Sequence, residues 1–136
     1  MTDNLDRIRQ FLANAPVAET LGLELLDAAP ERSAISMKIA PHITFDGATV
    51  QGAIVATLAD FAAVASASMV ARPNQFIATV GCETHNLAPA RGERLIAVGR
   101  LVSKPGRRMV AAADVYADDE RGTLCLTGLF TAAALD

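Results

Sequence analysis

The sequence predicts an α+β fold in which one antiparallel sheet packs against one long buried helix. Three observations predict it: a long Ala-rich apolar segment near the centre of the chain, two strand-like runs before it, and four strand-like runs after it. This order is typical of a helix and a sheet that share one hydrophobic core. With 136 residues, 51% of them apolar, the chain is expected to form a single domain over residues 1–136.

The first segment predicts a short amphipathic helix over about residues 3–14. Leu5, Ile8 and Leu12 recur at helical spacing, and Pro16 is expected to end the helix. We expect this helix to lie on the body of the domain with its apolar side inward.

The strand-like runs lie on both sides of the central segment. Residues 21–41 predict two strands that turn around Pro30, because apolar and polar side chains alternate there with a period of two. A loop follows, with Asp46-Gly47 as its turn signal. Turn-like sequences at hairpin spacing separate the four later runs, which predict an antiparallel meander. These runs are residues 75–89, 93–104, 107–118 and 122–133.

The central segment, about residues 50–71, predicts a helix that ends before Pro73. Between residues 47 and 71 the only charged side chain is Asp60. A charge in apolar surroundings is costly unless it is paired or its pKa shifts, so Asp60 needs a structural or a chemical reason. A membrane span is disfavoured, because a carboxylate near its middle costs about 2.5–3.5 kcal/mol.

The charge balance and the cysteines exclude several classes of protein. A net charge of −3 disfavours general nucleic-acid binding. Cys82 and Cys125 are expected to be two buried free thiols. The two histidines form no ligand cluster with recognisable spacing, so neither a metal nor another cofactor is expected. The first residues lack the apolar region of a secretory signal, which favours the cytoplasm.

Several stretches are similar to one known family. Residues 50–60, VQGAIVATLAD, resemble the His-Gly-Gly…Leu-Ala-Asp signature of phenylacetyl-CoA (PaaI-type) thioesterases, and residues 79–85, 86–102 and 104–130 resemble further parts of that family. The resemblance begins at about Leu21. It implies the hotdog fold, hydrolysis of an acyl-CoA thioester, and a homo-oligomer, at least a dimer and often a dimer of dimers. It also implies that each active site draws on two chains.

The resemblance assigns roles to three residues. Asp60 matches the catalytic carboxylate, which acts either as nucleophile or as general base. Gly52 matches the glycine whose N–H polarises the thioester carbonyl, as the free N–H groups at a helix start allow. Thr79 matches a hydroxyl that orients water or the carboxylate. If its strand is regular, Thr79 shares one face with Gly81 and Glu83. The structural alternatives are a hydrogen-bonded Asp, a tight turn and an ordinary strand Thr.

Three positions depart from the family pattern. Gln51 replaces the motif's His, Ala53 replaces its second Gly, and Phe45 stands where many relatives carry an Asn. Gln51 is able to orient a carbonyl by hydrogen bonding, but it cannot become a cation near neutral pH. Phe45 cannot do the polar work of an Asn, so it is expected to contact the substrate instead.

Two further groups are candidates for substrate binding. A cluster of cations around a predicted turn is expected to contact the phosphates of CoA, with a solvated hairpin tip as the alternative. Its members are Arg100, Lys104, Arg107 and Arg108. Apolar side chains of the central helix and the loop before it are candidates for lining an acyl pocket or for the core. These are Phe45, Ile54, Phe61, Val64 and Met69.

The sequence therefore predicts an acyl-CoA thioesterase that releases CoA and a carboxylic acid. Gln51 and Phe45 favour an alternative, a hotdog protein that binds acyl-CoA with little turnover. A hotdog hydratase or dehydratase is a weaker alternative, because those enzymes rely on a His and Gln51 occupies the start of the helix.

Overall fold

Ten elements of secondary structure form the chain, as seen in a computed structural model that describes residues 2–30, 32–73 and 75–135. They are α1 (Thr2–Asn14), α2 (Pro16–Leu21), β1 (Leu23–Ala29), β2 (Arg32–Lys38), the 3₁₀ helix η1 (Pro41–Ile43), α3 (Gly52–Ser68), β3 (Phe76–Asn86), β4 (Arg94–Leu101), β5 (Arg108–Ala117) and β6 (Leu124–Leu135).

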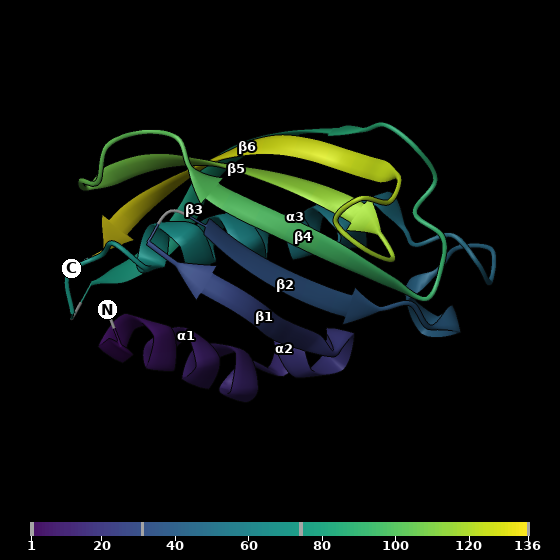
Figure 1. The fold of residues 1–136 in the computed structure, drawn as a ribbon, viewed down its shortest axis with the longest axis horizontal. Coiled ribbons are helices and arrows are strands. Elements are labelled where there is room, and N and C mark those ends of the chain that lie inside the picture. The colour runs from purple at the N-terminus through teal and green to yellow at the C-terminus, as the bar shows by residue number, and fades with distance from the viewer. Residues whose placement is uncertain (1, 31, 74, 136) are drawn as a thin grey trace.

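The strands form one six-stranded sheet in the order β1-β2-β4-β5-β6-β3, and every neighbouring pair is antiparallel. The sheet curves around α3, while α1 and α2 lie beside β1 (Figure 1). This arrangement confirms the α+β class and the single long helix against one face of the sheet.

The predicted four-stranded meander is wrong in one connection. β4, β5 and β6 follow one another as a meander, but β3 pairs with β6 and not with β4. Residues 87–93 therefore cross from one edge of the sheet to β4, which pairs with β2. The short turn signal before β4 is also compatible with a β3–β4 hairpin. Only the long-range pairing of the strands decides between a hairpin and a connection that crosses to the other side of the sheet.

The N-terminal helix is confirmed, and a second helix follows it. α1 ends at Asn14, and Pro16 begins α2 where the prediction had only a stop. Proline is favoured in the first turn of a helix because the N–H that it lacks has no partner there. Gly22, with φ of 67°, then ends α2 in the left-handed conformation that glycine adopts readily.

The central helix is confirmed but is shorter than predicted. After Ser68 the chain tightens into i→i+3 hydrogen bonds, from the N–H of Val70 to the carbonyl of Ala67 at 3.2 Å and from the N–H of Ala71 to the carbonyl of Ser68 at 3.3 Å. Pro73 disfavours helical geometry in the residue before it, so the helix has no way to continue. Within the described residues, no helix is long and apolar enough to cross a membrane.

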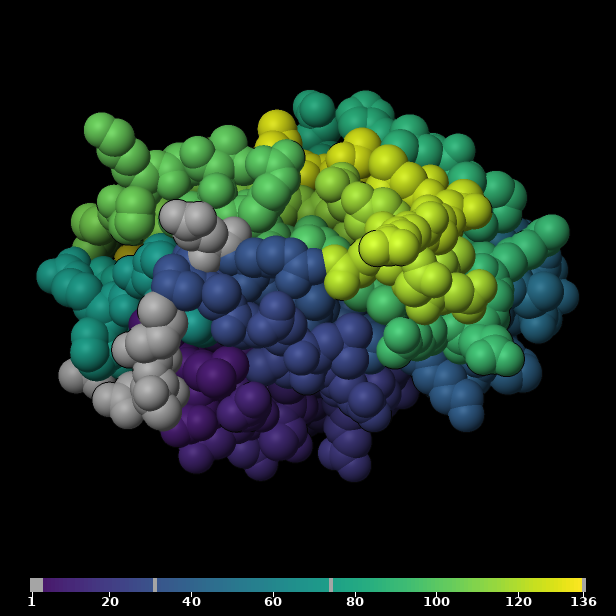
Figure 2. All heavy atoms as spheres, in the orientation of Figure 1, coloured from purple at the N-terminus to yellow at the C-terminus, as the bar shows by residue number. Residues whose placement is uncertain are grey.

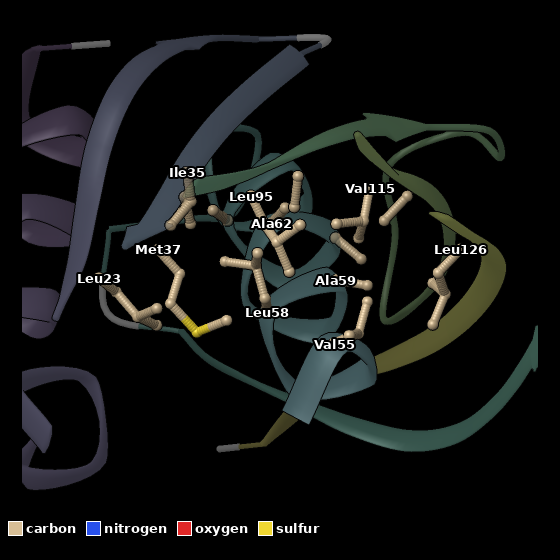
Figure 3. Packing of buried hydrophobic residues seen from close by; sticks show 14 of the residues in the cluster. Leu23, Ile35, Met37, Val55, Leu58, Ala59, Ala62, Leu95, Val115 and Leu126 are labelled. Carbon is tan, nitrogen blue, oxygen red and sulfur yellow. The ribbon is translucent and has the colours of Figure 1, made fainter. Parts of the chain in front are cut away.

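The core lies between α3 and the concave face of the sheet. Val55, Leu58, Ala59 and Ala62 point from the helix toward the strands (Figure 3). Small side chains let the two backbones approach, and at the closest point a Cβ added to Gly99 would lie 2.2 Å from the carbonyl oxygen of Ala62. α3 is therefore fixed against β4 along its inner face.

Candidate active site

A carboxylate and a hydroxyl meet where the outer side of α3 lies beside β3. The Thr79 hydroxyl donates a hydrogen bond of 2.5 Å to Oδ1 of Asp60. Both residues are half-buried, so the pair is shielded from bulk water but remains reachable from the edge of the sheet. The structure thus brings together two of the predicted site residues that are distant in sequence.

An irregularity in β3 directs Thr79 toward α3. The register of β3 against β6 shifts between Thr79 and Gly81, which leaves Val80 as a bulge. The predicted sharing of one face by Thr79, Gly81 and Glu83 is therefore wrong. Beyond the bulge, Cys82 is opposite the buried Phe130, so Cys82 and not Glu83 shares the face of Thr79.

The surroundings of Asp60 shift its acidity. Burial raises the pKa of the Asp60 carboxyl, because the charged form loses hydration, and the hydrogen bond from Thr79 opposes this rise. Burial is the larger effect, so the pKa of Asp60 lies above the ordinary range for Asp. A carboxylate with a raised pKa is a better proton acceptor than an exposed Asp.

The second part of the site is the start of α3. Gly52 is the first residue of the helix and Gln51 its cap, so the N–H groups of Gly52 and Ala53 have no acceptor inside the helix. Gln51 and Ala53 are exposed. A Cβ added to Gly52 would lie 3.4 Å from Nδ2 of Asn86, so the Asn86 side chain lies beside the helix start.

A polar clasp holds the loop that leads into α3. The Asp46 carboxylate accepts hydrogen bonds from the N–H groups of Ala48 and Thr49, and these lower the pKa of Asp46. Arg91, in the β3–β4 connection, donates from Nε to the Thr49 hydroxyl at 2.7 Å, and its Nη2 lies 3.7 Å from Oδ2 of Asp46. The clasp fixes the position from which α3 begins.

The clasp and Asn86 are features that the sequence did not predict as parts of the site. Arg91 is 42 residues from Thr49. Asn86 reaches the helix start only because the bulge in β3 sets its direction. Neither residue type carried a local signal for these contacts.

Phe45 lies outside the described lining of the cavity that Phe61 borders. Its side chain is 66% exposed at the tip of the loop. Ile54 packs against the core and Met69 is buried in it. Of the apolar candidates, Phe61 and Val64 line a cavity beside Asp60.

The predicted cations lie together at one corner. Arg100, Lys104, Arg107 and Arg108 are exposed around the turn between β4 and β5, which projects as a green knob at the upper left of Figure 2. The facing pairs Ala78–Ala133 and Ala133–Arg108 place this turn at the same end of the sheet as the beginning of β3.

The cysteines differ from the prediction in one respect. Cys125 is buried, but Cys82 is exposed because β3 is an edge strand. Among the residues that the structure describes, no three His, Cys, Asp or Glu side chains lie together as a metal site.

The two halves of the site are separate within one chain. Asp60 follows Gly52 by eight residues of continuous helix, which places them about 12 Å apart along its axis. One thioester carbonyl cannot contact both groups of the same chain.

These features and the sequence define one class of protein. The profile of the thioesterase superfamily matches residues 47–124, and the chain belongs to that superfamily. The sheet wrapped around α3 is the hotdog fold that the sequence resemblance implied.

Solved structures agree with this assignment. A thioesterase family protein from Silicibacter pomeroyi is 29% identical with a TM-score of 0.90, and the match covers 97% of this chain and 98% of that one. The PaaI protein of the phenylacetic acid degradation operon of E. coli is similar in fold, at 12% identity and a TM-score of 0.86, over 99% and 95% of the two chains. A thioesterase from Haemophilus influenzae matches at 16% identity with a TM-score of 0.85, and the match covers 97% of this chain and 90% of that one. No curated protein sequence matches the chain.

Proposed function

We propose that the protein is an acyl-CoA thioesterase, with Asp60 as its catalytic carboxylate. The observation that carries the proposal is the half-buried Asp60–Thr79 pair, with a raised Asp60 pKa, on a helix whose start supplies free N–H groups. Asp60 either removes a proton from the attacking water or attacks the carbonyl carbon itself. In both routes the C–S bond breaks, CoA leaves as a thiolate that takes up a proton, and water supplies the hydroxyl of the acid.

The N–H of Gly52 stabilises the oxyanion that forms on the carbonyl oxygen. A donor fixed in advance at the positive end of a helix favours the charge that develops in the transition state. Gln51 and Asn86 stand beside it, and their amides orient the carbonyl in place of a histidine.

An edge-to-edge pairing of two β3 strands completes the site. Thr79 lies beside Asp60, and Asn86 lies beside Gly52. Antiparallel pairing about a twofold axis near Cys82 and Glu83 brings the Thr79 region of one chain to the Asn86 region of the other. Asp60 of one chain then faces Gly52 of the second copy.

The exposed edge supports this dimer. β3 is 11 residues long, has no partner strand on its outer side within the described part of the chain, and exposes Phe76 and Val80, which are 58% and 51% accessible. A long strand edge that stays unpaired is prone to uncontrolled association. The proposed assembly is a dimer or a dimer of dimers, in the cytoplasm, and the four cations at the β4–β5 turn bind the phosphates of CoA.

Mixing two inactive variants tests hydrolysis and the shared site together. Asp60→Asn removes the carboxylate. Gly52→Pro removes the N–H at a position where proline suits the helix, and the ψ of 131° at Gln51 is one that a residue before proline adopts. In a random mixture about half of the dimers are mixed and each has one intact site, so about a quarter of the wild-type thiol release is expected to return.

A matched mixture controls this result. Asp60→Asn and Thr79→Val alter the same half of the site, so their mixture should only average the two parents. If the mixture of Asp60→Asn and Gly52→Pro also shows only the average activity of its two parents, the proposal of a shared site is wrong. If the wild-type chain releases no thiol from any acyl-CoA but binds it, hydrolysis is wrong and the binding-protein alternative, which the exposed Phe45 and Gln51 favour, replaces it.

The pH dependence of Thr79→Val tests the link between Thr79 and Asp60. The Thr79 hydroxyl lowers the pKa of Asp60 against the effect of burial, so its removal raises that pKa further. Catalysis needs the carboxylate, so the acid limb of the kcat/KM profile should move to higher pH. Thr127→Val, which removes the 2.6 Å bond to Asp114 elsewhere on the sheet, should leave the limb in place. If the acid limb of the kcat/KM profile does not move in Thr79→Val, the assignment of that limb to Asp60 is contradicted.

A further inference from the structure

The connection between β3 and β4 meets the start of α3 at two places. Asn86, the last residue of β3, has its side chain beside Gly52. Four residues later, the carbonyl oxygen of Ala90 accepts a hydrogen bond from the N–H of Val50 at 3.0 Å. One short segment therefore lies against both the first residue of α3 and the loop that leads into it.

The direction of the Gly52 N–H is set by the peptide to which it belongs. The carbonyl of Gln51, on the other side of the same peptide bond, accepts the N–H groups of Ile54 and Val55 at 2.9 and 3.1 Å. A trans peptide is planar, so the N–H points opposite to this carbonyl and away from the helix. Its direction is thus fixed by the helix, and its position depends on where residues 49–51 lie.

The side chain of Arg91 links these residues to the β3–β4 connection. Its Nε donates to the Thr49 hydroxyl at 2.7 Å, and that hydroxyl donates in turn to Oδ2 of Asp46 at 2.9 Å. Thr49 is only 6% exposed, so its hydroxyl depends on these two partners more than on water. Arg91 supplies the donor without which this chain of hydrogen bonds is incomplete.

The backbone that carries Arg91 is itself held in place. Gly92, the next residue, has φ of 131°, and a Cβ there would lie 2.6 Å from Oδ1 of Asp118. The absence of a side chain lets the Asp118 carboxylate approach and accept the N–H of Glu93 at 2.8 Å. Arg91 therefore extends toward Thr49 from a fixed segment.

We infer that Arg91 is a positioning residue, which acts through Thr49 to hold the Gly52 N–H where the thioester carbonyl binds. The inference rests on the proposed function, because it adds a residue that serves the same oxyanion site. The backbone bond to Ala90 remains when the Arg91 side chain is lost, so the fold is kept while the start of α3 becomes less fixed. A misplacement of about 1 Å at a reacting group costs about 100-fold in rate.

Arg91→Met removes the donors and keeps an unbranched side chain. We expect kcat for acyl-CoA hydrolysis to fall by about tenfold or more with little change in KM, because the Gly52 N–H serves the transition state more than the bound substrate. Thr49→Val should give a similar loss. Thr49→Ser keeps the hydroxyl and should retain nearly the wild-type kcat.

Arg94→Met is the matched control. Arg94 begins β4, directly after the same connection, and its Nε donates at 3.0 Å to the backbone oxygen of Asp118, away from the loop before α3. This variant also loses an arginine and a hydrogen bond to a turn, but it should keep the wild-type kcat.

A double-mutant cycle separates positioning from a general structural effect. In the Gly52→Pro background, which lacks the N–H, Arg91→Met should lower the residual kcat no further. An equal fall in both backgrounds overturns the inference but leaves the proposed function intact. Equal losses in Arg91→Met and Arg94→Met have the same meaning.

Amide hydrogen exchange gives a readout that does not require turnover. Arg91→Met should speed exchange of the Val50 N–H, which bonds to Ala90, by about tenfold, and Arg94→Met should leave it unchanged. If the wild type hydrolyses no thioester, the proposed function fails and this exchange alone decides: faster exchange in Arg91→Met supports its role at the start of α3. Equal exchange in the wild type and in Arg91→Met overturns that role.

Discussion

Asp60→Asn is expected to lower kcat/KM for acyl-CoA hydrolysis by about two orders of magnitude or more, because loss of a nucleophile or general base typically has that effect. The substitution keeps the shape of the side chain and an oxygen that accepts the Thr79 hydrogen bond. The measurement is thiol release at saturating and limiting substrate.

Stability should not fall with activity in this variant. Burial raises the pKa of Asp60, so the folded chain binds a proton more readily than the unfolded chain. Stability then decreases as the pH rises through this raised pKa, and at neutral pH the buried charge is a cost. Asp60→Asn removes that cost, so its melting temperature should equal or exceed that of the wild type.

Asp114 provides the matched control. Its carboxylate also accepts a hydrogen bond from a threonine, Thr127, at 2.6 Å across two neighbouring strands, but on the sheet face turned away from α3. Asp114→Asn should retain nearly full activity. Comparable losses in Asp60→Asn and Asp114→Asn would point to a general effect of carboxylate removal and would contradict a catalytic role for Asp60.

The largest expected loss of stability comes from Gly99→Ala. The added Cβ would lie 2.2 Å from the carbonyl oxygen of Ala62 and 2.5 Å from its carbon, and both are backbone atoms in the middle of α3. Neither is able to rotate away, so the helix must shift from β4. The hydroxyl of Ser33 donates to the same carbonyl at 2.7 Å and would lose that bond. We expect a decrease in the free energy of unfolding of about 3 kcal/mol or more, measured by urea denaturation.

Gly106→Ala controls for the general effect of replacing a glycine. A Cβ at Gly106 would meet only the carbonyl oxygen of Arg108, at 3.9 Å, so the change should stay within about 0.5 kcal/mol. Equal stability of the two variants would mean that the sheet and α3 adjust freely to each other, contrary to a tightly fixed core.

Elements with a strong local pattern could be predicted from the sequence. The spacing of Leu5, Ile8 and Leu12 predicts α1, and alternation predicts β1 and β2. The uncharged Ala-rich segment predicts α3, although its last turn tightens after Ser68. In these cases the side chains within a few residues decide the conformation.

Features set by distant contacts could not be predicted in the same way. β3 pairs with β6 and not with β4, which follows it in the sequence. The turn-like residues near Ala90 do not indicate this pairing. The bulge at Val80 reverses which residues of β3 face α3, because one extra residue changes the alternation. Asp60 and Gly52 were predicted as site residues from a resemblance, whereas the clasp of Arg91 on Thr49 and Asp46 depends on two loops that meet only in the folded chain.

The attachment of α1 has a consequence for which parts of the chain are able to change independently. Asn4 donates to the carbonyls of Met69 and Ala71, and Arg7 donates to those of Ser68 and Arg72, so α1 is attached to the end of α3. Mutations on the inner side of α1 therefore change the apolar cavity between α1 and α3, while Asp60 and Thr79 keep their geometry. Sequence change in one peripheral helix is thus separated from the hydrogen-bonded pair on α3 and β3.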